Sequence, residues 1–278
     1  MIIRSDWHIH SEASYDASLP LRTIVQRAAE LGIAHLGITD HLNFNDHAFL
    51  GDLHRSVADV KALQAEFPQL VLGVELTPLE QPLFDHIAKT GTRDGFVPPA
   101  AEKPYDITLP LTKEELRALG VRYAVGGAHW RVDGPNVRQL PVDRDACIRE
   151  WHRQQLWLAG DDRVTILAHP WYSGAALWYE DFDVIPRSMK LELAAAVKEN
   201  GKYVECNEDM FCDKRTTERF RRQYVEFLRE LFEMGIPLTY GSDSHDVYAA
   251  NIGLMEQYLL AAGFRDGDFS TLSEKDFW

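Results

Sequence analysis

Residues 2–10 read Ile2-Ile3-Arg4-Ser5-Asp6-Trp7-His8-Ile9-His10, a short apolar run that leads into an Asp-x-His-x-His motif. Side chains alternate with a period of two along a β-strand, so Asp6, His8 and His10 point to the same side. Two imidazoles on one face at a strand end can bind a single metal ion. The motif is short, and the prediction of a metal site depends on whether later segments supply further ligands.

The composition is that of a globular protein with a sizeable core. The chain has 278 residues, of which 45% are hydrophobic and 26% are charged. This length suits one large domain, and we expect residues 1–278 to form a single domain. The formal net charge is −14, whereas a nucleic-acid groove normally carries a basic excess. A nucleic-acid partner is therefore not expected.

The cysteines and the apolar runs bear on the cellular location. Cys147, Cys206 and Cys212 make an odd number of cysteines without a Cys-x-x-Cys pair, which indicates reduced thiols. Met1 runs almost directly into the opening motif, so a signal peptide is not expected. The apolar runs are shorter than the ~18 residues that a membrane span needs. The sequence thus predicts a cytoplasmic protein without a membrane partner.

Apolar strand-like segments alternate with helical periodicity along the chain. The segments that predict strands are residues 2–10, 33–39, 69–74, 121–128, 163–168, 201–206 and 237–241. Helices are predicted at about 19–31, from 57 to 67, and at about 143–159, 187–199, 216–234 and 252–262. Seven strand–helix repeats favour an α/β fold of the (β/α)7 type, a distorted barrel resembling a TIM barrel, over an open doubly wound sheet.

Two stretches depart from this rhythm. Residues 42–53 read as a loop, and residues 77–119 read as a long loop insertion with a short helix at 113–118. The insertion contains Gly91, Gly95 and several prolines, which interrupt regular structure. Long loops in compact domains are usually functional, so we expect the insertion to contribute to specificity.

Histidines and carboxylates stand at the ends of the predicted strands. They are His8, His10, His41, Glu75, His129, His169, Asp243 and His245. Asp16 lies in the loop after the first strand. Strand C-terminal ends converge on one mouth in barrel folds, which is where barrel enzymes place their chemistry. The pattern therefore predicts a metal site in that mouth.

These residues also carry a family resemblance. The matching segments are Asp6-Trp7-His8-Ile9-His10, Gly37-Ile38-Thr39-Asp40-His41, Gly73-Val74-Glu75, Ala128-His129, Ala168-His169-Pro170 and Gly241-Ser242-Asp243-Ser244-His245. Together they resemble the polymerase and histidinol phosphatase (PHP) family of metal-dependent phosphoesterases. Residues 121–130 and 204–207 look most like its histidinol-phosphatase branch. The resemblance implies a distorted seven-stranded barrel.

The resemblance further implies two or three divalent metal ions, and the residue types suit zinc, iron or manganese alike. One ion would be held by His8, His10, Glu75 and Asp243. Glu75 would bridge to a second ion, held also by His129 and His169. A third ion would be held by Asp16, His41 and His245. Many phosphatases of the family that this chain resembles have a histidine at the position of Asp16. His86, inside the insertion, competes with His129 as a ligand.

The function that follows is hydrolysis of a small-molecule phosphomonoester by a metal-activated hydroxide. Asp243 and His245 are expected at the reaction centre, with Asp6 orienting a ligand histidine or a water. Arg131 and Arg215 are candidate grips for the phosphate.

Two further residues are candidates for the site, and three other functions are considered. Trp171 is a candidate for the substrate pocket, and Asn207 for a hydrogen bond at the site or a turn cap. A nuclease acting on nucleic-acid ends, an amidohydrolase and a metal-dependent binding module are the alternatives. The oligomeric state is not predicted.

Overall fold

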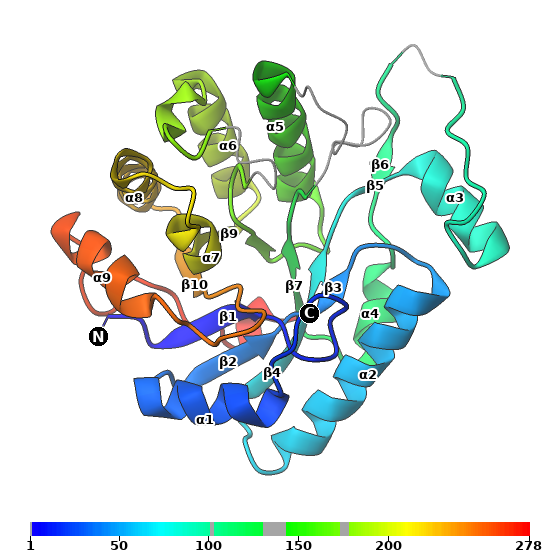
Figure 1. The fold of residues 1–278 in the computed structure, drawn as a ribbon, viewed down its shortest axis with the longest axis horizontal. Helices are drawn as coiled ribbons and strands as arrows, with labels where there is room; N and C mark the ends of the chain where they lie inside the picture. Colours follow the sequence, from blue (N-terminus) through cyan, green and yellow to red (C-terminus); the bar gives the residue numbers. More distant parts are fainter. Residues whose placement is uncertain (1, 101–102, 130–142, 173–177) are drawn as a thin grey trace.

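The computed structural model of the chain describes residues 2–100, 103–129, 143–172 and 178–278. It forms an α/β fold in which seven parallel strands alternate with helices (Figure 1). The strands are β1 (Ser5–Ile9), β2 (His35–Ile38), β4 (Leu70–Leu76), β7 (Tyr123–Gly126), β8 (Ile166–Leu167), β9 (Tyr203–Asn207) and β10 (Leu238–Gly241). Their order in the sheet is their order in the chain.

The sheet closes nearly into a barrel. The end of β1 meets the residues just after β10, where the Asp243 amide donates to the His8 carbonyl at 2.8 Å. The His10 amide donates to the Ser244 carbonyl at 3.1 Å. This confirms the predicted distorted (β/α)7 barrel and brings the first and last ligand-bearing segments side by side.

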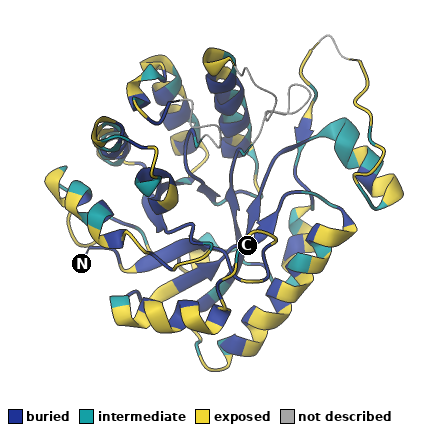
Figure 2. Cartoon of the chain, viewed as in Figure 1, coloured by how far each residue is buried: buried dark blue, intermediate teal, exposed yellow. Residues whose placement is uncertain are grey.

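Most of the helices cover the outside of the sheet, with buried faces inward and exposed faces outward (Figure 2). They are α1 (Leu21–Leu31), α2 (His47–Gln64), α3 (Gln81–Thr90), α4 (Lys113–Leu119), α5 (Arg144–Gly160), α6 (Arg187–Glu199), α7 (Glu208–Cys212), α8 (Glu218–Glu233) and α9 (Ile252–Ala261). In α8, Phe220, Tyr224 and Phe227 recur at helical spacing and are buried. Among the described residues, no helix combines the length and apolarity needed to cross a membrane.

The prediction of a loop at 42–53 is wrong for its second half, which is helical. A short strand, β3 (His41–Leu42), pairs with β4, and α2 begins at His47. The Asp46 side chain caps this helix by accepting hydrogen bonds from the amides of Ala48 and Phe49.

The predicted loop insertion at 77–119 is also more structured than expected. Strands β5 (Leu79–Glu80) and β6 (Ile107–Thr108) form an antiparallel ribbon. Helix α3 follows β5 and projects from the barrel (Figure 1). Pro82 lies in its first turn and Gly91 caps its end in a left-handed conformation. Proline and glycine, which suggested interruptions of regular structure, therefore mark the two ends of a helix here. The predicted short helix at 113–118 is confirmed as α4.

A second apolar cluster lies apart from the layer between sheet and helices. It consists of Trp7, Tyr123, Val125, Ile166, Ala168 and Leu272. The Tyr123 hydroxyl donates to the Trp7 carbonyl at 2.7 Å. A Cβ on Gly37 would lie 1.8 Å from that hydroxyl oxygen, so only glycine leaves room for it. Leu272, from the C-terminal segment, joins strand residues in this cluster.

Candidate metal centre

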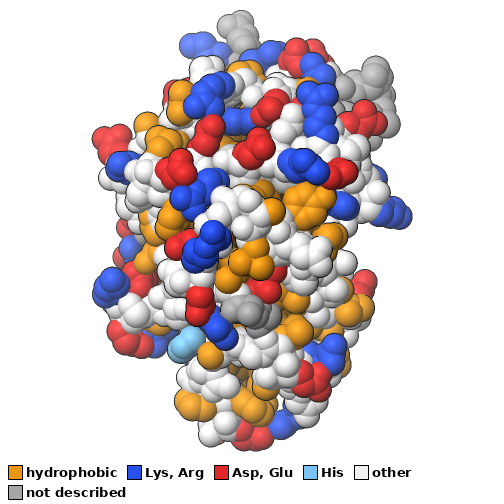
Figure 3. All heavy atoms as spheres, turned by 90° about the vertical axis from the view of Figure 1, so that its left-hand side faces the viewer, with side chains coloured by type: hydrophobic (Ala, Val, Ile, Leu, Met, Phe, Trp, Pro, Cys, Tyr) orange, Lys and Arg blue, Asp and Glu red, His pale blue; other side chains and the backbone are white. Residues whose placement is uncertain are grey.

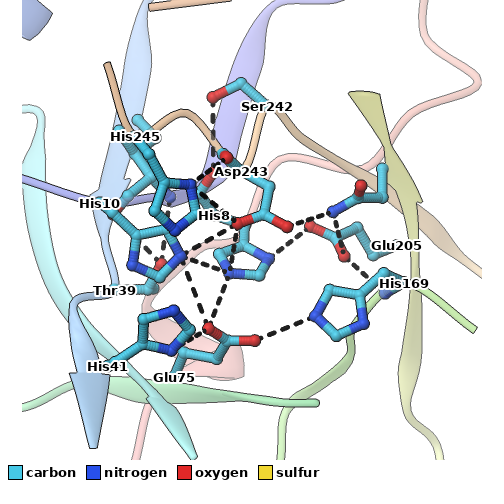
Figure 4. A network of polar contacts seen from close by, with 12 residues as sticks. His8, His10, Thr39, His41, Glu75, His169, Glu205, Ser242, Asp243 and His245 are labelled. Atoms are coloured by element: carbon cyan, nitrogen blue, oxygen red, sulfur yellow. Dashed lines mark hydrogen bonds and ion pairs between the residues drawn. The ribbon is translucent and has the colours of Figure 1, made fainter. Parts of the chain in front are cut away.

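The predicted ligands converge at the C-terminal ends of the strands (Figure 4). His8 lies in β1 and His10 follows it, Glu75 lies near the end of β4, and Asp243 follows β10. All four are buried. They come from opposite ends of the chain, and barrel closure brings them together.

Four ligand atoms define a compact cage. The Nε2 atoms of His8 and His10 are 3.1 Å apart. They lie 3.3 and 3.5 Å, respectively, from Glu75 Oε2. The same two atoms lie 3.5 and 3.0 Å from Asp243 Oδ1. The two imidazole nitrogens therefore each lie within 3.5 Å of both carboxylate oxygens.

The cage has the size that a divalent ion requires. Zinc bonds of about 2.0–2.1 Å place the corners of a coordination tetrahedron roughly 3.3–3.4 Å apart. The five separations above lie around that value, and imidazole with carboxylate is a donor set that suits zinc, iron or manganese. The residues present therefore fit a metal ion at this position.

The second oxygen of Glu75 faces a different pair of histidines. Its Oε1 lies 3.2 Å from His129 Nε2 and 3.0 Å from His169 Nε2. The Thr77 hydroxyl lies 2.8 Å from His129 Nδ1, which fixes the ring orientation. Glu75 thus stands between two groups of ligands, as the bridging role predicted for it requires.

A third group lies on the open side of the cluster. His41 Nε2 and His245 Nε2 lie 3.4 and 3.7 Å from Asp16 Oδ2. The rings of His41 and His245 both stack against His10, with centroid distances of 4.2 and 4.3 Å. Asp16 is held by a 3.0 Å hydrogen bond from the Ser14 hydroxyl. This group is wider than the first cage and more exposed.

Burial and mutual charge determine the protonation of the cluster. Burial, with the nearby His41 and His245, lowers the pKa of His10 to about 3. Burial would raise the pKa of Glu75, but His129, His41 and His8 hold it well below its usual value. A neutral imidazole beside an ionised carboxylate is the state in which both bind metal.

Two backbone conformations are strained where the ligands converge. His169 has φ 24° and Asp243 has φ 52°, although neither is a glycine. Gly127 lies beside His169, and a Cβ there would lie 2.6 Å from Glu75 Oε1, 2.7 Å from a ring carbon of His169 and 2.9 Å from one of His129. The strand ends are thus shaped to let three ligands approach one another.

Asp6 supports the site through the backbone. Its Oδ1 accepts hydrogen bonds from the amides of His8 at 3.2 Å and Ser242 at 3.0 Å. Burial raises the pKa of Asp6 to about 7. Asp6 is fully buried and joins the two segments that carry His8 and Asp243, so its contacts place these ligands rather than reach a substrate.

The predicted substrate-binding residues have different outcomes. Trp171 is fully buried, stacks on His152 and packs edge-on against Phe182 and Phe227, a position that does not favour the predicted pocket role. Arg215 lies over the ring of Tyr179 at 5.2 Å and makes an ion pair with Asp213 at 2.6 Å. Arg131 lies outside the described residues.

The choice between His129 and His86 has a geometric answer. His129 Nε2 faces Glu75, whereas His86 lies in α3 and its Nε2 is 3.1 Å from the Asp94 carbonyl. In the described part of the chain, His86 belongs to none of the groups that could hold a metal. The structure therefore supports His129.

Sequence reasoning missed one residue at the site. Glu205 is almost fully buried in β9 and contacts His8. Tyr172, which follows the candidate Trp171 in the chain, lies against the ring of His169 with a centroid distance of 5.1 Å. A charged residue inside a buried strand was the available signal for Glu205. Asn207 fulfils both alternatives considered for it, because its amide nitrogen donates to Asp243 and its oxygen caps α7.

Comparison with known proteins agrees with this geometry. A family model described as the PHP domain matches residues 6–209. A comparison with curated proteins gives no match.

A solved structure shares the fold. The structure of histidinol phosphate phosphatase from Lactococcus lactis, complexed with zinc, L-histidinol and phosphate, is similar over 99% of this chain and 98% of that one, with a TM-score of 0.70 and 19% identity. A ligand-free structure from Agrobacterium tumefaciens is similar over 95% of this chain and 90% of that one, with a TM-score of 0.46 and 12% identity.

Proposed function

Because the chain belongs to the PHP-domain family, we propose that it is a metal-dependent phosphoesterase that hydrolyses a small-molecule phosphomonoester. The observation that carries the proposal is the position of Glu75. Its two carboxylate oxygens face separate ligand groups, as in enzymes that hold two ions a few ångströms apart. A phosphate group can be held between two such ions.

The side chains of the proposed site would bind the ions in three groups. His8, His10, Glu75 and Asp243 would hold one ion, and His129 and His169 with Glu75 a second. Asp16, His41 and His245 would hold a third. Bound ions would neutralise phosphate charge and lower the pKa of a water molecule. The chain's own contribution is to place these ions beside one another in a buried setting.

Exposure indicates the side from which a substrate approaches. The side chains of Asp16, His245 and His129 are 31%, 27% and 16% exposed, whereas those of His8 and His169 are nearly fully buried. His245 directs its Nε2 to this open side, while its Nδ1 lies 2.9 Å from the Asp243 carbonyl. We therefore assign His245 to the substrate side of the site, as a ligand of the third ion, and Asp243 to the buried first ion.

The alternative functions receive less support. On the face in Figure 3, Lys and Arg side chains lie interspersed with Asp and Glu, as on an ordinary solvated surface. The net charge of −14 also disfavours a nucleic-acid substrate. No observation on the described residues favours an amide over a phosphate ester.

The test is a screen for phosphate release on a panel of phosphomonoesters. The panel includes L-histidinol phosphate, because the similar structure from Lactococcus lactis contains L-histidinol and phosphate. Protein loaded with zinc, iron or manganese is expected to release phosphate, and chelator-treated protein is not. Metal-loaded protein that is inert on the panel but degrades single-stranded DNA, or hydrolyses amides, would overturn the proposal.

A further inference from the structure

Glu205 occupies an unusual position beneath the proposed metal centre. It lies on β9 and is almost fully buried, and it belongs to none of the groups that could hold a metal in the described part of the chain. Figure 4 shows its carboxylate between His8 and His169, on the side away from Glu75. Any effect of Glu205 on the metal centre must therefore be exerted through His8 and His169.

Both oxygens of Glu205 accept hydrogen bonds. Oε1 lies 2.7 Å from His8 Nδ1. Oε2 accepts from the backbone amide of His169 at 2.6 Å and from Asn207 Nδ2 at 3.2 Å. A carboxylate only accepts, so the proton of the neutral His8 ring must lie on Nδ1. This leaves His8 Nε2, the atom that faces Glu75 and Asp243, free to bind a metal.

The same carboxylate reaches the second ligand group. His169 has φ 24°, a conformation that residues other than glycine rarely adopt, and its amide is held by Glu205. Asn207 donates from one nitrogen to both Glu205 Oε2 and Asp243 Oδ2, the latter at 3.0 Å. One buried side chain is thus linked to His8, His169 and Asp243.

The neighbouring strand leaves room for this carboxylate. Gly241 lies on β10, and a Cβ there would stand 1.8 Å from Glu205 Oε1. A larger residue at position 241 would displace the carboxylate from His8. The site of Glu205 is therefore formed by two strands together.

We propose that Glu205 is a positioning residue that holds His8 and His169 in their metal-binding orientations and so couples the two ligand groups bridged by Glu75. The inference rests on the proposed metal-dependent function. It adds that the affinity for metal depends on a side chain that does not touch the metal. Outer partners of this kind typically contribute about 10–100-fold to metal affinity.

The test compares E205Q with E208Q. Glutamine has the shape of glutamate but places an NH2 group opposite either His8 Nδ1 or the donors at Oε2. Glu208 is a matched control, because it is also buried and accepts from the Tyr240 hydroxyl and the Asn251 amide, without contact to a proposed ligand. Zinc affinity is measured by competition with a chelator, and the His8 Nδ1 proton is followed by NMR in the zinc-loaded proteins.

We expect E205Q to bind zinc about 10–100-fold more weakly and to lose or shift its downfield imidazole N–H signal. E208Q should keep the wild-type zinc affinity and signal. Equal zinc affinity in E205Q and wild type would overturn the proposal. An equal loss in E208Q would overturn it as well, because the effect would then be that of any buried glutamate.

Two further results separate this inference from the proposed function. If the wild-type protein binds no zinc, the metal-dependent function itself fails. If E205Q does not fold, E205D takes its place, since it keeps both acceptor oxygens but withdraws them by one methylene. A folded E205D with wild-type zinc affinity would overturn the role of Glu205 and leave the metal centre standing.

Discussion

Glu75 is the residue on which the site depends most. Its Oε2 faces His8 and His41 and its Oε1 faces His129 and His169, so its two oxygens are placed to contribute to two ions. Asp16 stands at the exposed edge and contacts the outermost group only. Removing these two carboxylates should therefore have unequal consequences.

We expect Glu75→Ala to lose two metal ions per chain and Asp16→Ala to lose one at most. The bridging carboxylate supplies a ligand to each of two ions, whereas Asp16 supplies one ligand to the widest group. Elemental analysis of metal-loaded, desalted protein measures the difference. Retention of the wild-type metal content by Glu75→Ala would contradict the bridging assignment.

Metal binding should also depend on pH through the ligand histidines. Burial would lower the pKa of His41, but Glu75 and Asp16 raise it to about 10. Burial would also lower the pKa of His8, but the negative charges of Asp243, Glu205 and Glu75 raise it well above its usual value. Both rings therefore carry an extra proton near neutral pH when no metal is bound, and the metal must displace it.

Zinc affinity should consequently rise with pH, by roughly tenfold per unit for each displaced proton, as long as the pH stays below the raised pKa values. Calorimetric titrations in two buffers with different protonation enthalpies count the protons released. Zinc binding without proton release near pH 7 would contradict this description of the cluster.

The proposed ligands could be selected from the sequence at the residue scale, because imidazoles and carboxylates recur at the ends of the predicted strands. Glu205 was not, because a single buried glutamate gives no spacing pattern. Its role appears only when β9 lies beside β10 and Gly241 leaves the space. The burial of Trp171 was likewise not predictable, since the sequence places it beside His169 but does not show that its ring turns into the core.

At the scale of elements, the loop predicted at 42–53 was wrong because the Asp46 side chain caps the start of α2. Asp46 instead begins α2, and its side chain also makes a 2.7 Å ion pair with Arg93 from the insertion. The same residue types signal a loop or a helix start, and tertiary contacts select between them.

We expect Asp46→Ala to lower the free energy of unfolding by about 1–2 kcal/mol, because two helix amides lose their cap. Glu30→Ala is the control, since Glu30 pairs with Arg27 on an exposed helix surface and should change stability by at most about 0.5 kcal/mol. Urea denaturation measures both variants. Equal stabilities would show that the Asp46 cap does not determine the start of α2.

At the scale of the whole molecule, the proposed ions join segments from the beginning, middle and end of the chain. The first cage alone joins β1, β4 and the segment after β10. The barrel closes there through hydrogen bonds between β1 and residues 243–244. That residues 1–278 form a single domain stays a prediction, as does the role of the insertion in specificity.

Metal removal should therefore lower the thermal stability of the whole barrel. A ligand present at 1,000 times its Kd stabilises the folded state by about 4 kcal/mol. We expect chelator-treated protein to unfold at a lower Tm and added zinc to restore it, as measured by circular dichroism. A Tm unaffected by the chelator, with metal loss verified, would contradict a stabilising role.

The central claim is that the strand-end cluster is a metal centre that hydrolyses phosphomonoesters. Its most direct test is phosphate release by one preparation, measured as purified, after chelation and after readdition of metal, with the metal content determined at each stage. The account predicts activity that disappears and returns with the bound metal and is absent in His8→Ala/His10→Ala protein. Phosphate release that persists in the metal-free protein or in the double variant would contradict it.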